Sequence, residues 1–289
     1  MKFYQKLLQV IINLTLGWCF YEGGVRELKR SLSKIIRKFI FKHQKVALEN
    51  VANLPQLDIP QFNNKASLVE YLGPPKMSTY EDQKLSQPPP GVANILSVRG
   101  FLGVVSSVEC EFDSFSKVLE KKGQITYTGN LETVLSESIT VAKINAHRYF
   151  SEETFKELFG SNVHFHFLDG AVKKDGPSAG ITITTAYLSL LLNKEIPANI
   201  GMTGEISLNG TVGKIGGLHA KLAAAKSHKL KTIFAPYGNM NDAFELPIEL
   251  KRGLDLYFVR EYSQIYEFIF EGKTNLIKDK ILDGIVFSK

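Results

Sequence analysis

The chain has 289 residues, of which 44% are hydrophobic and 22% charged, a balance typical of globular domains and not of disordered or fibrous chains. Its formal net charge of +6 permits weak binding to nucleic acid or to a membrane surface without requiring it. The two cysteines, Cys19 and Cys110, lie far apart, which argues against a disulfide framework and favours a reducing or matrix-like compartment.

The N-terminal part is predicted to be helical. An apolar run over residues 7–20 is shorter than the roughly 20 residues that a membrane-spanning helix needs, so no membrane span is expected. The first 21 residues lack acidic side chains, which would also suit a transit-type leader. Apolar residues recur at helical spacing within residues 22–42, with basic residues on the other face, which predicts an amphipathic helix. A second, short helix is expected over residues 66–72. We interpret the basic face as solvated, because no aromatic interleaving supports nucleic-acid binding.

Five of the eleven prolines fall within residues 74–90, separated by polar residues. Such a stretch is typical of a linker between domains. The sequence therefore predicts a small helical domain over residues 1–73, a linker over 74–90 and a main domain over 91–289.

Strand and helix patterns alternate through the main domain, which predicts an α/β or α+β fold. Strands are expected over residues 93–112 with a turn at 100–103, and over 124–127, 163–167, 232–235 and 254–259. An Asn-Gly pair within residues 205–212 predicts a hairpin. Helices are expected over residues 131–146, 181–192, 218–226 and 261–270.

A polar turn, Lys174-Asp175-Gly176-Pro177-Ser178-Ala179-Gly180, precedes the most apolar of these helices. Pro177 suits the first turn of a helix, where its missing N–H costs nothing. Ser178 is then expected at a helix N-terminus, where backbone N–H groups and the helix dipole favour negative charge. A nucleophilic serine needs such donors for the oxyanion that forms on its substrate, and it also needs a base.

The sequence contains three kinds of candidate chemical site: two glycine-rich turns, a histidine pair and a lysine. The glycine-rich turns at 176–180 and 213–217 could hold phosphate, but neither has the P-loop pattern, which is absent from the sequence. His164 and His166 share a strand face, yet no third ligand lies near them in the sequence, so no metal site is predicted. Lys221 lies among Leu and Ala residues of a predicted buried helix, where desolvation would lower its pKa toward that of a general base.

Three motifs of this sequence resemble motifs of the Lon protease family and occur in the same order and at similar spacing. Residues 174–180 resemble its active-site serine motif, and residues 201–210, beginning Gly-Met-Thr-Gly-Glu, resemble its second motif. Residues 215–221 resemble the turn and helix that carry its catalytic lysine, and Lys221 follows Ser178 by 43 residues, as in the family. Residues 24–28 and 70–73 are similar to the small helical subdomain of the family's AAA+ ATPase module. The resemblance extends over residues 5–270.

This resemblance implies a Lon proteolytic domain of mixed sheets with packed helices, preceded by a partial AAA+ helical subdomain. It implies a serine peptidase with a Ser178–Lys221 dyad that degrades unfolded polypeptides. Thr203 would orient the lysine, and Asp175 would shape the serine loop. His164, His166, Gly176 and Pro177 would line the substrate groove. Arg26 would be the remnant of a nucleotide sensor.

The family assembles as rings, usually hexamers, and uses ATP and magnesium. Because the P-loop is absent from this sequence, no cofactor is expected for this chain. The family resemblance also implies a homo-oligomeric ring. The segments 88–92 and 254–262 are most similar to mitochondrial Lon, which favours the mitochondrial matrix over the cytoplasm. The family's Trp-Thr and Gly-Gly pairs are replaced by Val98-Arg99 and Leu102-Gly103, which weakens the expectation of peptide binding. The alternative to a peptidase is a non-catalytic, ring-forming scaffold of the same fold.

Overall fold

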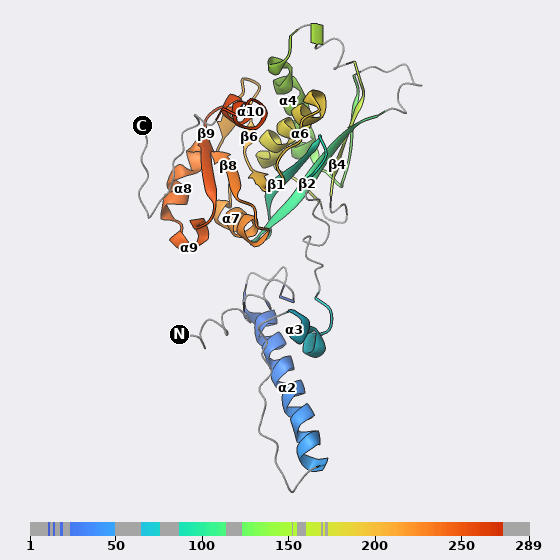
Figure 1. The fold of residues 1–289 in the computed structure, drawn as a ribbon, viewed down its shortest axis with the longest axis vertical. Helices are drawn as coiled ribbons and strands as arrows, with labels where there is room; N and C mark the ends of the chain where they lie inside the picture. The colour runs from blue at the N-terminus through green and yellow to red at the C-terminus, as the bar shows by residue number, and fades with distance from the viewer. Residues whose placement is uncertain are drawn as a thin grey trace. The chain divides into compact units, whose positions relative to one another are not determined.

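The chain divides into two compact units, Met1–Lys84 and Leu85–Lys289, which are described separately. The computed structural model (Figure 1) describes residues 11, 14, 18–19, 24–49, 65–75, 87–113, 123–151, 153–154, 160–168, 170 and 173–273. Most of the apolar run at 7–20 and residues 76–86 of the proline-rich segment therefore lie outside the described residues. The division falls within the predicted linker, but the assignment of the first unit to an ATPase subdomain stays a prediction. Within the described ranges, no helix combines the length and the apolar character that crossing a membrane requires.

The first unit is built on two helices, α2 (Arg26–Glu49) and α3 (Lys65–Leu72), both predicted from the sequence. One side of α2 packs against α3 and against residues near the N-terminus in a small hydrophobic core. Gly73, at a φ of +82°, ends α3 in a left-handed conformation that favours glycine. The core contains Leu14, Trp18, Cys19, Ile35, Leu68 and Tyr71, with Leu28, Leu32, Phe39 and Leu72 at its edge.

The second unit contains a mixed seven-stranded sheet in the order β3-β4-β2-β1-β5-β8-β9. The β1–β2 and β2–β4 pairs are antiparallel, and the other neighbours are parallel. Both the α/β class and the predicted strands are thereby confirmed. The strands are β1 (Val92–Arg99), β2 (Leu102–Phe112), β3 (Ile125–Thr128), β4 (Val163–Phe167), β5 (Ile200–Met202), β8 (Thr232–Pro236) and β9 (Asp255–Val259).

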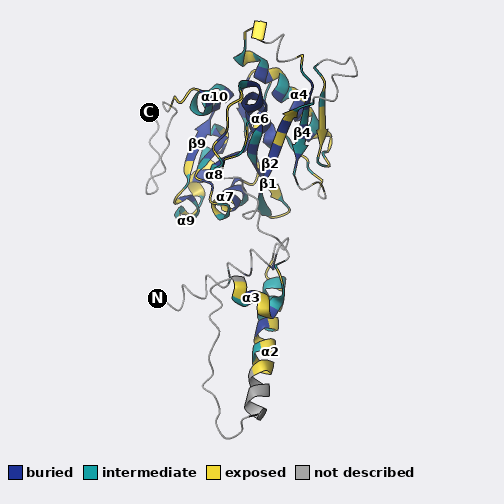
Figure 2. Cartoon of the chain, turned by 45° about the vertical axis from the view of Figure 1, so that its right-hand side comes forward, coloured by how far each residue is buried: buried dark blue, intermediate teal, exposed yellow. Residues whose placement is uncertain are grey.

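A hydrophobic core lies on each face of this sheet, because successive residues of a strand point to opposite faces. Ile95 enters the core that α4, α6 and α10 cover, whereas Leu96 enters the core that α7 covers. Figure 2 shows α6 as buried nearly throughout, which explains why its sequence is apolar on all sides. The helices of this unit are α4 (Thr133–Ala146), α6 (Gly180–Leu192), α7 (Leu218–Ser227), α8 (Met240–Glu245), α9 (Ile248–Lys251) and α10 (Tyr262–Phe270).

The predicted hairpin exists, but its turn differs from the expected type. Strands β6 (Glu205–Ile206) and β7 (Val212–Gly213) pair through a loop over residues 207–211. Only Gly210 of the Asn-Gly pair has positive φ, whereas a two-residue turn of the type that Asn-Gly favours needs positive φ at both positions. The Asn209 side chain instead accepts a hydrogen bond from the Thr211 N–H at 3.1 Å, which closes a wider loop.

Helix α7 lies unusually close to strand β2 at Gly103. A Cβ atom at this glycine would stand 1.8 Å from the carbonyl oxygen of Ala220, the residue before Lys221. No side chain fits there without moving α7. The absence of a side chain at position 103 therefore helps to set where Lys221 lies.

We expect Gly103→Ala to destabilise the second unit by about 1–3 kcal/mol, since the new methyl group must displace backbone atoms and not a flexible side chain. Urea unfolding would measure the change. Gly216→Ala is the matched control, because a Cβ there meets nothing within 4 Å. Equal unfolding free energies for Gly103→Ala and wild type would show that α7 does not approach β2 so closely.

Candidate active site

Ser178 lies in a short 3-10 turn, Pro177–Ala179, that leads directly into α6. Pro177 opens the turn, as predicted, although Ser178 precedes the α-helix and does not lie inside it. Gly176 has a φ of +100°, and a Cβ there would meet no neighbour within 4 Å. The backbone conformation, and not a lack of space, therefore requires glycine at this position.

Backbone hydrogen bonds tie the serine turn to the segment after β5. The Gly204 N–H donates to the Ser178 carbonyl oxygen at 2.7 Å, and the Ile181 N–H donates to the Gly204 carbonyl oxygen at 3.1 Å. The Thr203 N–H in turn donates to the Phe234 carbonyl oxygen at 3.0 Å. The turn that carries Ser178 is thus anchored through residues 203–204 to strand β8.

Lys221 reaches the same place from α7. Its side chain is 3% exposed, and its Nζ donates a hydrogen bond to the Thr203 hydroxyl at 2.9 Å. That hydroxyl donates to the Ser178 carbonyl oxygen at 3.3 Å. The structure therefore brings together the three residues that the separate motifs predicted. In the described part of the chain, Lys221 has no carboxylate partner and the Ser178 hydroxyl makes no hydrogen bond.

Burial changes the protonation of Lys221. Removing the amine from water disfavours its charged form, which lowers the pKa of Lys221 from 10.5 to about 8. Among the described residues, no acid offsets this effect, because the partner of the amine is the neutral Thr203 hydroxyl. A substantial neutral fraction near physiological pH follows, and a neutral amine can accept a proton.

Helix α6 holds Met202, the residue before Thr203, through two buried threonines. The Thr182 hydroxyl donates to the Met202 carbonyl oxygen at 3.2 Å, and the Thr185 hydroxyl contacts the Met202 sulfur at 3.5 Å. Thr185 also shares a hydrogen bond of 2.8 Å with the Tyr262 hydroxyl of α10. Sequence reasoning missed these supports. The available signal was the presence of threonines in an apolar helix, since buried hydroxyls require partners.

The paired histidines lie on a polar face at the β2-β4-β3 end of the sheet. The Thr126 hydroxyl contacts His164 Nδ1 and the Thr128 hydroxyl contacts His166 Nδ1, both at 2.7 Å. Glu111 and Glu109 stand opposite the two histidines on β2. Within the described ranges, no group of three or more His, Cys, Asp or Glu side chains is arranged to hold a metal ion.

The chain that follows β3 connects this face to the serine loop. Lys174 forms a parallel bridge with Leu131, and its N–H donates to the Asn130 carbonyl oxygen at 3.0 Å. The Glu132 N–H donates to the Lys174 carbonyl oxygen at 2.9 Å. One extended segment therefore pairs with the histidine strand β4 and then with the loop that contains Gly176 and Pro177. The role of these residues in a substrate groove stays a prediction.

The two remaining predicted site residues lie apart from these contacts. Asp175 is exposed, and no hydrogen bond or ion pair joins its carboxylate to another described residue. Arg26 is exposed at the start of α2, in the first unit. The loop-shaping role of Asp175 and the sensor origin of Arg26 are not tested by these positions and stay predictions.

Replacing Lys221 with Met should stabilise the protein at neutral pH. Burial disfavours the charged form of Lys221. Above the unfolded pKa of 10.5 the lysine is neutral in both states and burial carries no charge penalty. As pH falls from 10.5 through about 8, the folded protein loses stability, because the unfolded lysine takes up its proton first. Wild type should therefore be less stable than Lys221→Met by up to about 3 kcal/mol below pH 8, and the gap should narrow toward pH 10.5. Urea unfolding across this range would measure it. A gap independent of pH would contradict the lowered pKa.

Comparison of the sequence with known proteins identifies one family. The family model described as "Lon protease (S16) C-terminal proteolytic domain" matches residues 63–272. A Lon protease of Metamycoplasma arthritidis is 36% identical over 258 residues, and one of Chlamydia trachomatis is 37% identical over 258 residues. A mitochondrial Lon protease homolog of Ostreococcus lucimarinus is 38% identical over 250 residues. The alignments cover 87%, 87% and 85% of this chain, but only 29%, 30% and 25% of these relatives, respectively. The chain belongs to the Lon protease family.

Proposed function

We propose that this chain is a serine endopeptidase of the Lon type that uses a Ser178–Lys221 dyad. The observation that carries the proposal is the buried Lys221 amine, which has a lowered pKa and is linked through Thr203 to the backbone of Ser178. The Lys221 amine is linked through Thr203 to a serine turn at a helix N-terminus, and this arrangement supports an acyl-transfer site.

In the acylation half of the reaction, the Ser178 hydroxyl oxygen attacks the peptide carbonyl carbon, and its proton passes to Lys221 Nζ. The carbonyl oxygen becomes an oxyanion, for which the N–H groups of Ser178 and Ala179 are the expected donors, because they belong to the first turn of a helix. When the C–N bond breaks, the Lys221 ammonium returns the proton to the leaving amine. An acyl-enzyme ester on Ser178 remains.

In the second half, Lys221 takes a proton from a water molecule that attacks the ester carbonyl. The ester bond breaks, the Ser178 oxygen recovers a proton from Lys221, and the new carboxyl terminus leaves. Thr203 aims the amine throughout, since its hydroxyl holds Lys221 Nζ and the Ser178 backbone at once. Catalysis requires the Ser178 hydroxyl to come within hydrogen-bond reach of Nζ, a contact that often forms only when substrate binds.

Unfolded polypeptide is the substrate class that we propose, as implied by the family. The sequence contains no P-loop pattern, so we propose that these residues supply the peptidase step and do not themselves bind and hydrolyse ATP in the usual way. Ring assembly remains a prediction from the family resemblance. A mitochondrial location also remains a prediction, because the relatives include both mitochondrial and bacterial proteins.

Ser178→Ala and Lys221→Met should each reduce hydrolysis of an unfolded protein by about a thousandfold or more, since each removes a partner in one proton transfer. Labelling of Ser178 by a fluorophosphonate should rise with pH to a plateau with a midpoint near 8, because the neutral lysine is the active form.

Lys226→Met serves as the control, because Lys226 lies on the same helix with its side chain exposed. It should leave labelling unchanged. Wild-type turnover no greater than that of Ser178→Ala would favour the non-catalytic scaffold instead.

A second prediction concerns Thr182, which supports Met202 and hence Thr203. Thr182→Val removes the hydrogen bond to the Met202 carbonyl at almost constant volume and should lower kcat by about tenfold while shifting the pH midpoint of labelling. Thr184→Val is the matched control: Thr184 is equally buried on α6, but its hydroxyl bonds to the Gly180 carbonyl oxygen within the helix. If both variants changed kcat equally and neither moved the pH midpoint, the loss would reflect helix stability and not positioning.

A further inference from the structure

The positive charge of the chain is concentrated on one helix. Residues 26–42 of α2 hold seven Lys or Arg residues and one Glu, a net charge of +6. The whole chain also has a net charge of +6, from 35 basic and 29 acidic residues, so the rest of the chain holds 28 of each and is neutral. A separate explanation is needed for this helix, because the proposed peptidase chemistry uses none of it.

Apolar side chains lie beside these charges on the exposed side of α2. Phe41 is 72% exposed, Ile36 56% and Ile40 48%, although the opposite side of the helix already supplies the buried core. Figure 2 shows exposed residues along α2 in yellow. Apolar side chains next to cations on one helix are the features that bind an amphipathic partner.

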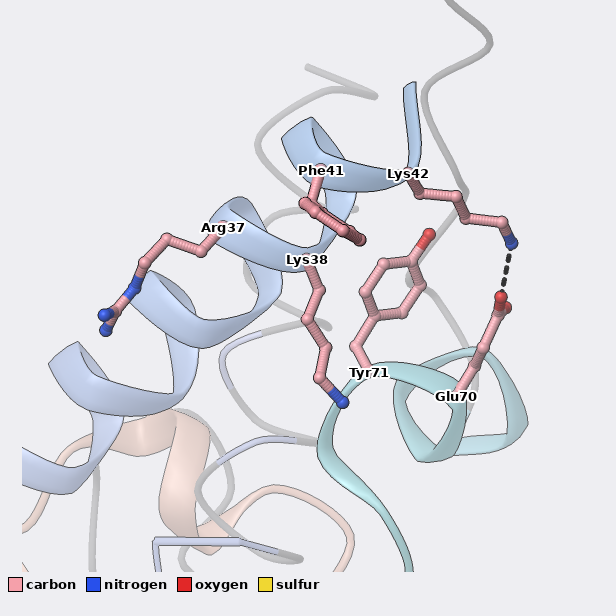
Figure 3. A pocket seen from close by; sticks show the side chains of 6 residues that line it. All are labelled: Arg37, Lys38, Phe41, Lys42, Glu70 and Tyr71. Atoms are coloured by element: carbon pink, nitrogen blue, oxygen red, sulfur yellow. Dashed lines mark hydrogen bonds and ion pairs between the residues drawn. The ribbon is translucent and has the colours of Figure 1, made fainter. Parts of the chain in front are cut away.

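A groove of about 540 Å³ lies between α2 and α3 next to this surface (Figure 3). Tyr71 is a buried residue of α3 that lines it, and Phe41 of α2 lines the opposite side. Lys38 extends alongside Tyr71, below Phe41 in the view, and Arg37 projects away from Tyr71 on the left. The groove thus offers aromatic surface together with cationic groups.

The charges around the groove are unbalanced. Glu70 is the one acidic residue among its lining residues, and its carboxylate is paired with Lys42 at 2.6 Å. Within the described ranges, Lys38 and Arg37 have no carboxylate partner. An occupant that supplies carboxylates would complement these two cations, and one that also supplies an apolar side chain would cover Phe41.

We propose that the α2–α3 groove is a docking site for an acidic polypeptide segment that presents an aromatic or aliphatic side chain next to carboxylates. A concave site favours a polypeptide over a membrane, since a lipid surface is too broad to reach its floor. The apolar lining favours a polypeptide over duplex nucleic acid, because a duplex presents its phosphate backbone outward and keeps its bases stacked inside, away from Phe41. The proposal does not depend on the Ser178–Lys221 chemistry.

The test is fluorescence anisotropy of a labelled peptide of alternating Glu and Phe with the full chain. Wild type should bind this peptide, more tightly at low salt, and should not bind the analogue with Gln in place of Glu. The double variant Arg37→Glu with Lys38→Glu should weaken binding at least tenfold. Phe41→Ser should weaken binding several-fold with little change in salt dependence. These side chains are exposed, so circular dichroism of the variants should match wild type.

Lys231→Glu is the control for total charge, because Lys231 is an exposed lysine of the second unit. Its affinity for the peptide should equal that of wild type. Three results would overturn the proposal: no binding by wild type at low salt, an equal loss of affinity in Lys231→Glu, or tighter Arg37- and Lys38-dependent binding of oligothymidine or phosphatidylglycerol vesicles.

Discussion

The contact on which the site depends is the hydrogen bond from the buried Lys221 amine to the Thr203 hydroxyl. An amine that loses water and gains only a neutral partner becomes easier to deprotonate. The fold maintains this unfavourable burial from several sides. Gly103 lets α7 lie against β2, and α6 fixes the residue before Thr203. The Gly204 N–H ties the same segment to the serine turn. Helices from both faces of the sheet therefore converge on the contact between Lys221 and Thr203.

Most of the fold follows from periodicity and turn residues in the sequence. The strict alternation of residues 163–167 gives β4, and the apolar run after Ser178 gives the buried helix α6. Strand β5 was missed because three residues are too few to show a period, although it is parallel to β1 and β8. The short helices α8 and α9 have six and four residues and were missed for the same reason. Tertiary packing, and not local preference, decides such elements.

Part of the candidate site was predicted from the sequence, and part was found only in the structure. Motif resemblance identified Ser178, Thr203 and Lys221 together, and the structure brings them into one hydrogen-bonded chain. Burial of a lysine alone would not have done so. Lys251 is also buried, at 6% exposed, but its amine donates to the Ala243 and Phe244 carbonyl oxygens near the end of α8. The acceptors in the fold distinguish this helix-capping lysine from Lys221, whose acceptor is a hydroxyl next to a serine turn. The same holds for Thr182, whose partner is 20 residues away.

The central claim is that burial lowers the pKa of Lys221 enough to leave a substantial neutral fraction of the amine near physiological pH, and NMR titration of lysines labelled at Cε tests it most directly. Ser178→Ala protein would be titrated, and the resonance that disappears in the Ser178→Ala, Lys221→Met double variant would be assigned to Lys221. The account predicts a midpoint near 8 for this resonance, against 10.5 for an unperturbed lysine. A Lys221 resonance that titrates near 10.5 would contradict the account, because the amine would then be charged and unable to accept the proton of Ser178.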